Sequence, residues 1–90
     1  GEPSDDGLTQ NLHREFRDTL GRDPLSAIER ARELIYTKEL DPNFRLNILR
    51  ELKVLQFSHP GVSELAGELL ENPPDPLLFE EALTIKYASL

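Results

Sequence analysis

DPNFRLNILRELKVLQF, residues 41–57, is the segment that decides the fold of this chain. It is the most apolar segment of the sequence, and its opening Asp41-Pro42 pair is typical of a helix start. At 3.6 residues per turn its apolar side chains lie on two opposed sides. One side carries Phe44, Ile48, Leu52 and Leu55, and the other carries Leu46, Leu49 and Phe57. Because a helix that is apolar on two sides needs neighbours on two sides, we expect residues 42–57 to form the central helix of an all-α domain.

The same periodicity predicts four flanking helices, over residues 8–20, 24–38, 62–71 and from residue 76 toward the end of the chain. The prolines that mark the later helix starts, at 24, 42, 60 and 76, are 18, 18 and 16 residues apart. The predicted fold class is therefore all-α, a compact bundle of about five short helices with the helix at 42–57 central. The regular spacing leaves a fragment of an α-helical repeat array as an alternative, because such arrays have helix-pair periods of about 36 residues.

Length and composition place the chain in the class of small single domains. We expect residues 1–6, GEPSDD, to be a disordered acidic tail and residues 7–90 to be one helical domain. Since there is no cysteine, disulfides and cysteine-based zinc sites are excluded. No apolar run approaches the roughly 20 residues that cross a bilayer, so we expect a soluble protein, with an intracellular location favoured and the compartment undetermined.

No pattern in the sequence is typical of a catalytic, cofactor or metal site. The two histidines, His13 and His59, have no ligand partner at a recognised spacing, and we expect both to be solvated or to lie at helix ends. Ser58 precedes His59 directly, but adjacent side chains seldom face each other, and we expect Ser58 to cap the following helix. We therefore expect no enzyme and no cofactor.

Charge is distributed unevenly along the chain, whose net charge is −7. Residues 54–90 carry one lysine against six acidic residues, and most basic residues precede this part. An acidic protein repels phosphate backbones, so nucleic acid is not an expected partner. Arg14, Arg17 and Arg22 leave a nucleic-acid-binding regulator as an alternative, although acidic residues are interleaved with them.

The function we predict is that of a non-enzymatic protein–protein interaction module, part of a larger protein or complex. If the second apolar side of the 42–57 helix exceeds what four short helices can cover, it marks an interface. An acidic stripe at helical spacing on the 62–71 segment points to a partner with a basic surface. The predicted partner-binding residues are Leu46, Leu49, Val54, Phe57, Glu64, Glu68 and Glu71.

Self-association is the second possibility for the partner. With about ninety residues, short helices and opposed basic and acidic faces, the chain resembles the death-fold class of signalling adaptors. This resemblance implies that Arg14, Arg17, Arg22 and Arg32 of one copy meet the Glu64–Glu71 face of another in a homo-oligomer. The chain departs from that class in showing five helices where the fold has six.

Overall fold

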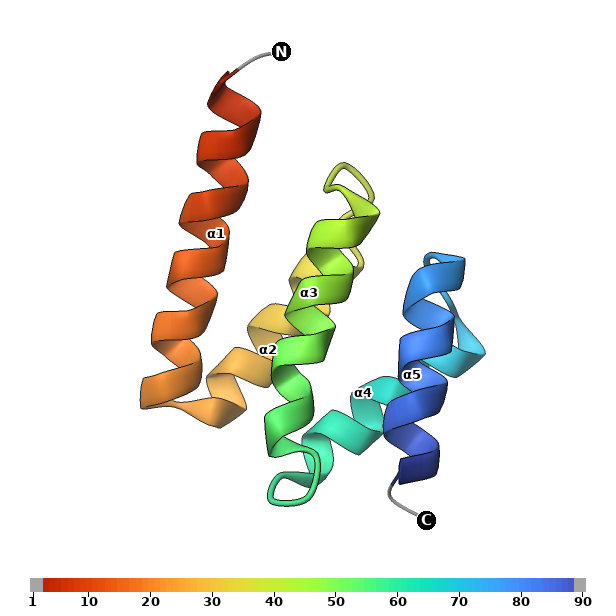
Figure 1. Cartoon of the computed structure of the whole chain (residues 1–90). Helices are drawn as coiled ribbons and strands as arrows, with labels where there is room; N and C mark the ends of the chain where they lie inside the picture. The colour runs from red at the N-terminus through yellow and green to blue at the C-terminus, as the bar shows by residue number, and fades with distance from the viewer. Residues whose placement is uncertain (1–2, 89–90) are drawn as a thin grey trace.

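The computed structural model describes residues 3–88, and side chains from residue 7 onward. Its secondary structure within this range is helical throughout, without a strand, which confirms the all-α prediction (Figure 1). The elements are α1 (Pro3–Arg22), α2 (Pro24–Ile35), α3 (Pro42–Leu52), the short 3₁₀ helix η1 (Lys53–Leu55), α4 (Pro60–Glu71) and α5 (Pro76–Ala88).

Aspartate-proline pairs begin three of these helices, as predicted. Asp23 accepts a hydrogen bond from the amide of Ser26 at 3.4 Å, and Asp41 accepts one from the amide of Asn43 at 2.7 Å. Asp75 accepts from the amide of Leu77 at 2.9 Å. Each aspartate thus satisfies an amide hydrogen that has no partner within the helix, and the proline that follows already has a helical φ. Hydrogen bonds from the Ser26 side chain and backbone also lower the pKa of Asp23.

The helices form two layers (Figure 1). In one layer α1, α3 and α5 run in the same direction with α3 between the other two, and α2 and α4 run back behind them. The smallest extent of the chain is 15 Å, against 43 and 30 Å in the other directions, as expected for two layers packed about 10 Å apart. The predicted central place of the 42–57 segment is therefore confirmed for its α-helical part, residues 42–52.

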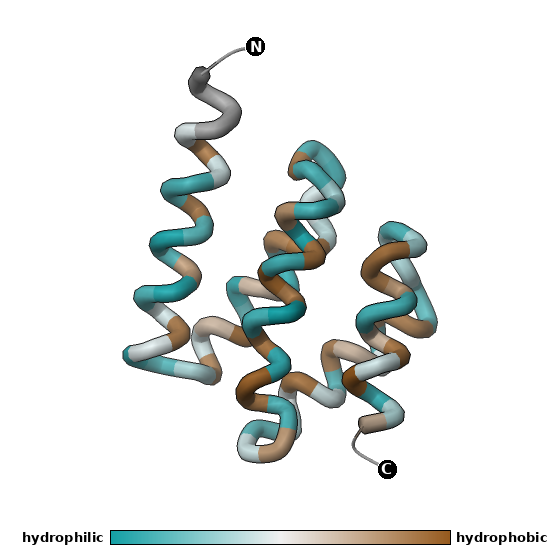
Figure 2. The backbone as a smooth tube through the Cα atoms, in the orientation of Figure 1, coloured by the Kyte–Doolittle hydropathy of each residue, from teal (hydrophilic) through white to brown (hydrophobic). Residues whose placement is uncertain are grey.

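The core lies between the two layers, and α3 contributes to it from both of its apolar sides. Ile48 and Leu52 from one side are fully buried, and so is Leu49 from the other, while Leu46 is 8 % exposed. Figure 2 shows the contrast with α1, which is hydrophilic over most of its length. Among residues 7–22 of α1, only Phe16 is fully buried, with Leu12 and Leu20 partly buried against the core.

Several helix boundaries differ from the prediction. The 24–38 helix ends earlier, at Ile35, the 62–71 helix begins earlier, at Pro60, and the first and central helices differ most. The first helix begins at Pro3 instead of near Leu8, so residues 3–6 of the expected tail have helical backbone, and residues 1 and 2 lie outside the described residues. The central α-helix ends at Leu52 instead of Phe57. After Leu52 the chain tightens into η1 and then into a turn in which the amide of His59 donates to the carbonyl of Leu55 at 2.8 Å. Pro60 requires an extended residue before it, and His59 accordingly has φ −132° and ψ 108°.

A buried arginine joins α3 to the end of α2. Arg45 is 4 % exposed, and its Nη1 donates to the carbonyl of Ile35, the last residue of α2, at 3.0 Å. Its Nε donates to the carbonyl of Leu40 in the connecting loop at 3.2 Å. Because the C-terminal end of a helix carries partial negative charge, the cation is favourably placed there. Arg45 thus holds the loop between the two helices in place.

Candidate functional site

The structure separates the predicted apolar partner-binding residues into two groups. Leu46 and Leu49 are buried between the layers, so they are core residues and offer no surface to a partner. Val54 and Phe57 are 75 % and 76 % exposed, the largest exposures among the big apolar side chains of residues 7–88. The single stripe predicted on one helix does not form, because η1 and the following turn carry Val54 and Phe57 out of the helical register.

A groove of about 570 Å³ lies beside Val54, between the C-terminal half of α1 and the end of α3. Leu20 and Leu55, both half-buried, give it apolar walls, and Arg17 and Glu51 lie at its polar side. Nε of Arg17 is 3.6 Å from Glu51 Oε1, so these opposite charges neighbour each other across the groove. The arrangement can accept an apolar side chain next to a polar or charged one.

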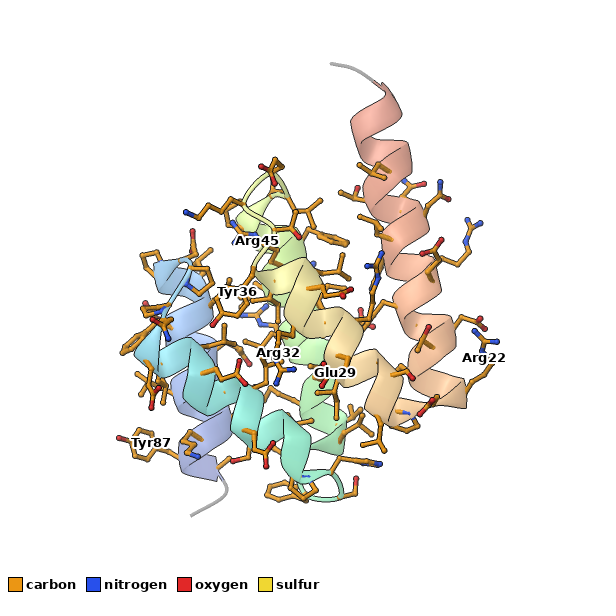
Figure 3. The ribbon with its side chains drawn as sticks, turned by 180° about the vertical axis from the view of Figure 1, so that it is seen from behind. Arg22, Glu29, Arg32, Tyr36, Arg45 and Tyr87 are labelled. Atoms are coloured by element: carbon orange, nitrogen blue, oxygen red, sulfur yellow. The ribbon has the colours of Figure 1, made fainter. Side chains whose placement is uncertain are left out.

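The predicted acidic stripe on α4 is partly neutralised by α2. Glu68 accepts two hydrogen bonds from Arg32, from Nε at 3.1 Å and from Nη2 at 2.8 Å, and the other terminal nitrogen of Arg32 binds Glu29 (Figure 3). The contact with Glu68 raises the pKa of Arg32. Glu64 and Glu71 are exposed and make no ion pair with any side chain of residues 7–88. Of the three glutamates, therefore, Glu68 holds α2 to α4, and Glu64 and Glu71 remain unpaired among residues 7–88.

Tyr36 completes the junction between α2 and α4 on the back of the molecule (Figure 3). Its hydroxyl donates to the carbonyl of Asn72, the residue that ends α4, at 3.2 Å. Burial raises the pKa of Tyr36, and the negative charge of Glu68 raises it further. The hydroxyl is therefore held in its neutral, donating form.

This raised pKa predicts an alkaline loss of stability. Below the unfolded tyrosine pKa of about 10, Tyr36 is protonated in both states, and its full contribution to stability is present. As the pH rises from about 10 toward the higher pKa of the folded state, the unfolded chain loses the proton first, so the free energy of unfolding falls. We expect Tyr36→Phe to flatten this fall between about pH 9 and 11 in urea unfolding followed by circular dichroism. Tyr87→Phe is the matched control because Tyr87 is exposed, and equal flattening in that variant would contradict the assignment.

The arginines expected to form a basic patch are mostly engaged within the chain. Arg22 lies 3.0 Å from Asp18 on the same helix, and Arg17 faces Glu51 as described above. Arg32, assigned to the same patch in the self-association hypothesis, is bound by glutamates on both sides. Arg14 is exposed. The described side chains therefore form no unopposed basic face. They support neither the nucleic-acid-binding alternative nor self-association of the death-fold kind.

His13 is solvated only in part, since its side chain is 34 % exposed. Its Nε2 lies within hydrogen-bonding distance of Glu51, 38 residues away, and its ring meets that of Phe44 edge-on with centroids 6.3 Å apart. These contacts attach α1 to α3 beside the groove, which Glu51 also lines. A local pattern could not reveal this pair, because the partners come from different helices.

Ser58 does not cap α4, contrary to the prediction. The residue that caps α4 is His59, which makes no side-chain capping hydrogen bond. Ser58 Oγ lies 3.2 Å from His59 Nδ1 and donates to the carbonyl of Leu55 at 3.4 Å. No described side chain orients the other ring nitrogen of His59, so the pair lacks the third member of a nucleophilic triad.

Among residues 7–88, no group of three or more histidine or carboxylate side chains is placed to hold a metal ion. Within the same range, no helix has the length and apolar character needed to cross a membrane.

Comparisons with known proteins added no further assignment. No family model, no curated protein and no solved structure matches this chain.

Proposed function

We propose that the chain is a non-enzymatic protein-interaction module that contacts its partner through the surface around Val54 and Phe57. The observation that supports this proposal is their exposure: two large apolar side chains, three residues apart, are three-quarters in water. Burial of such side chains in a partner removes apolar area from water, at about 25 cal/mol per Å². The neighbouring groove with its Leu20 and Leu55 walls offers a second apolar contact.

The charge of this part of the chain favours a partner with a basic surface. Residues 54–90 carry a net charge of −5, from one lysine and six acidic residues. Glu64 and Glu71 are unpaired within residues 7–88 and are free to meet basic side chains at the rim of an interface. Rim charges mainly accelerate association, so binding should weaken as salt concentration rises.

The decisive experiment compares the double variant Val54→Ser/Phe57→Ser with the wild-type chain as bait in a quantitative pull-down. We expect the proteins retained by the wild type to be lost at least tenfold from the variant, because the apolar anchor is gone. Leu8→Ser is the matched control, since Leu8 is also exposed and apolar but lies at the opposite end of α1. Equal retention by all three baits, each shown to be folded by circular dichroism, would refute the proposal.

The same double variant separates a foreign partner from a second copy of the chain. Light scattering measures the mass of the wild-type chain at increasing concentration. A dimer that Val54→Ser/Phe57→Ser converts to a monomer identifies self-association through this surface.

A further inference from the structure

A second surface, the outer edge of α4 and α5, has the form of an incomplete helix junction. In Figure 1, α5 ends the front layer on the side opposite α1, and no helix of residues 3–88 lies beyond it. The two ends of the layers differ in character. The α1 end is mainly hydrophilic, as is typical of the cap of a helical stack, whereas α5 is rich in apolar residues (Figure 2).

The junction between the helix pairs α2–α3 and α4–α5 shows how one pair packs on the next. The pair α4–α5 packs on the pair α2–α3, and each of its helices supplies one glutamate. Glu68 of α4 binds Arg32 of α2, as described above. Glu81 of α5, only 11 % exposed, lies 3.3 Å from Arg50 Nε and 3.2 Å from Lys53 Nζ of the α3–η1 segment.

In the front layer, α3 and α5 carry equivalent residues 33 positions apart. Arg50 and Lys53 face α5, and the residues 33 positions later in α5 are Leu83 and Lys86. This offset is set by two buried triplets with identical spacing, Arg45, Leu49 and Leu52 in α3 and Leu78, Ala82 and Ile85 in α5.

The back layer repeats in the same way with an offset of 35. Ile28 and Arg32 of α2 face α4: Ile28 packs on Gly61, where an added Cβ would lie 3.3 Å from its Cδ1. Their equivalents in α4 are Ser63 and Gly67. The buried triplets that set this offset are Ala27, Ala31 and Leu34 in α2 and Val62, Ala66 and Leu69 in α4.

Equivalent positions of α3 and α5 differ in exposure. Leu46 of α3 is 8 % exposed, but its equivalent in α5, Phe79, is 36 % exposed, and Leu83 is half-buried. Lys86 is exposed and makes no ion pair with residues 7–88, although its equivalent, Lys53, pairs with a glutamate of the next helix pair. The α4–α5 edge therefore offers the apolar and charged groups of a junction without the helices that cover them.

We propose that the α4–α5 edge is a docking surface for a further helical hairpin that continues both layers. The hairpin packs apolar side chains on Phe79 and Leu83 and places a carboxylate opposite Lys86, as Glu81 does opposite Lys53. Gly67 stands where α2 has Arg32, and the ammonium group of Lys86 lies beside it, because its Nζ would be 3.7 Å from a Cβ added at Gly67. A second copy of this chain is the poorer occupant, because joining two such edges would bring together two segments, residues 54–90 of each copy, that each carry a net charge of −5. This surface is separate from Val54 and Phe57, so the two proposals stand independently.

The test adds such a hairpin to the chain. A second copy of residues 56–88, joined after Leu90, supplies an α4–α5 hairpin whose own Glu81 is placed to meet Lys86 of the first copy. We expect the extended chain to unfold in one transition, with a Tm about 5–10 °C above that of the 90-residue chain, because each added neighbour stabilises a helical stack. An unchanged Tm or two separate transitions would overturn the proposal.

Single substitutions in the first copy locate the contact. Leu83→Asp should abolish the gain in Tm, whereas Leu77→Asp, on the opposite flank of α5 and 41 % exposed, should retain it. Lys86→Glu, an exposed position that the fold tolerates, should reduce the gain, and Glu81→Lys in the added copy should restore it. Equal losses from the Leu77 and Leu83 variants, or no effect of the Lys86 variant, would count against the assigned geometry. If the mass of the 90-residue chain in solution rises with concentration, and Leu83→Asp abolishes that rise, the occupant of the edge is a second copy of the chain and not a separate hairpin.

Discussion

Arg45→Ala lowers the free energy of unfolding by about 2–4 kcal/mol, because it removes both donors that satisfy the carbonyls of Ile35 and Leu40. Each buried carbonyl left without a donor costs about 1–3 kcal/mol, and the favourable placement of a cation at the end of α2 is lost as well. A domain of this size has a total stability of about 5–10 kcal/mol, so the loss is a large part of it. Urea unfolding followed by circular dichroism measures the change.

Two further substitutions at this position separate the contributions of the side chain. Arg45→Met retains the apolar stem and removes the donors, so it isolates the hydrogen bonds. Arg45→Lys retains the charge but not the planar arrangement of donors that reaches two carbonyls, and we expect an intermediate loss. If Arg45→Met were as stable as the wild type, the hydrogen bonds would contribute nothing net, and the account of this loop would be wrong.

Leu49→Ala lowers the free energy of unfolding by about 2–5 kcal/mol, because Leu49 is fully buried and its truncation leaves a cavity between the layers. Val54→Ala, from the same predicted partner-binding set, changes it by less than about 0.5 kcal/mol, since Val54 is three-quarters exposed. Thermal unfolding of the two variants beside the wild type measures the difference.

The comparison also tests the division of the predicted site into core and surface. The reverse order, with Val54→Ala costing more than Leu49→Ala, would place Val54 in the core and remove the basis of the proposed interaction surface. Comparable small losses in both variants would show that α3 is not the centre of the domain.

Most of the helical architecture could be predicted from local sequence. The starts of α2, α3 and α5 are set by aspartate-proline pairs, whose effect depends only on residues within one turn. The helix ends were less predictable. α3 ends at Leu52, where the chain continues into η1 and a turn, and no proline or glycine between residues 52 and 57 marks that end in the sequence.

The candidate site was predictable only in part. The sequence indicated an apolar surplus on the 42–57 segment, and Val54 and Phe57 are the part of it that the structure leaves exposed. Leu46 and Leu49 have the same hydrophobic character, but α3 lies between neighbours that cover them. Glu68 belonged to a stripe without a base on its own helix, and its partner Arg32 lies 36 residues earlier on another helix.

The amino-acid sequence by itself determined that the chain is all-α, where most helices begin and which segment is central, because capping and helical periodicity act over a few residues. Only the tertiary structure decided which apolar side chains are core, which charges are neutralised and which edge is left open. Burial and ion pairing depend on which helices become neighbours, so they join residues such as His13 and Glu51 that share no local pattern. The two proposed surfaces, at Val54–Phe57 and at the α4–α5 edge, are among the apolar groups that this packing leaves uncovered.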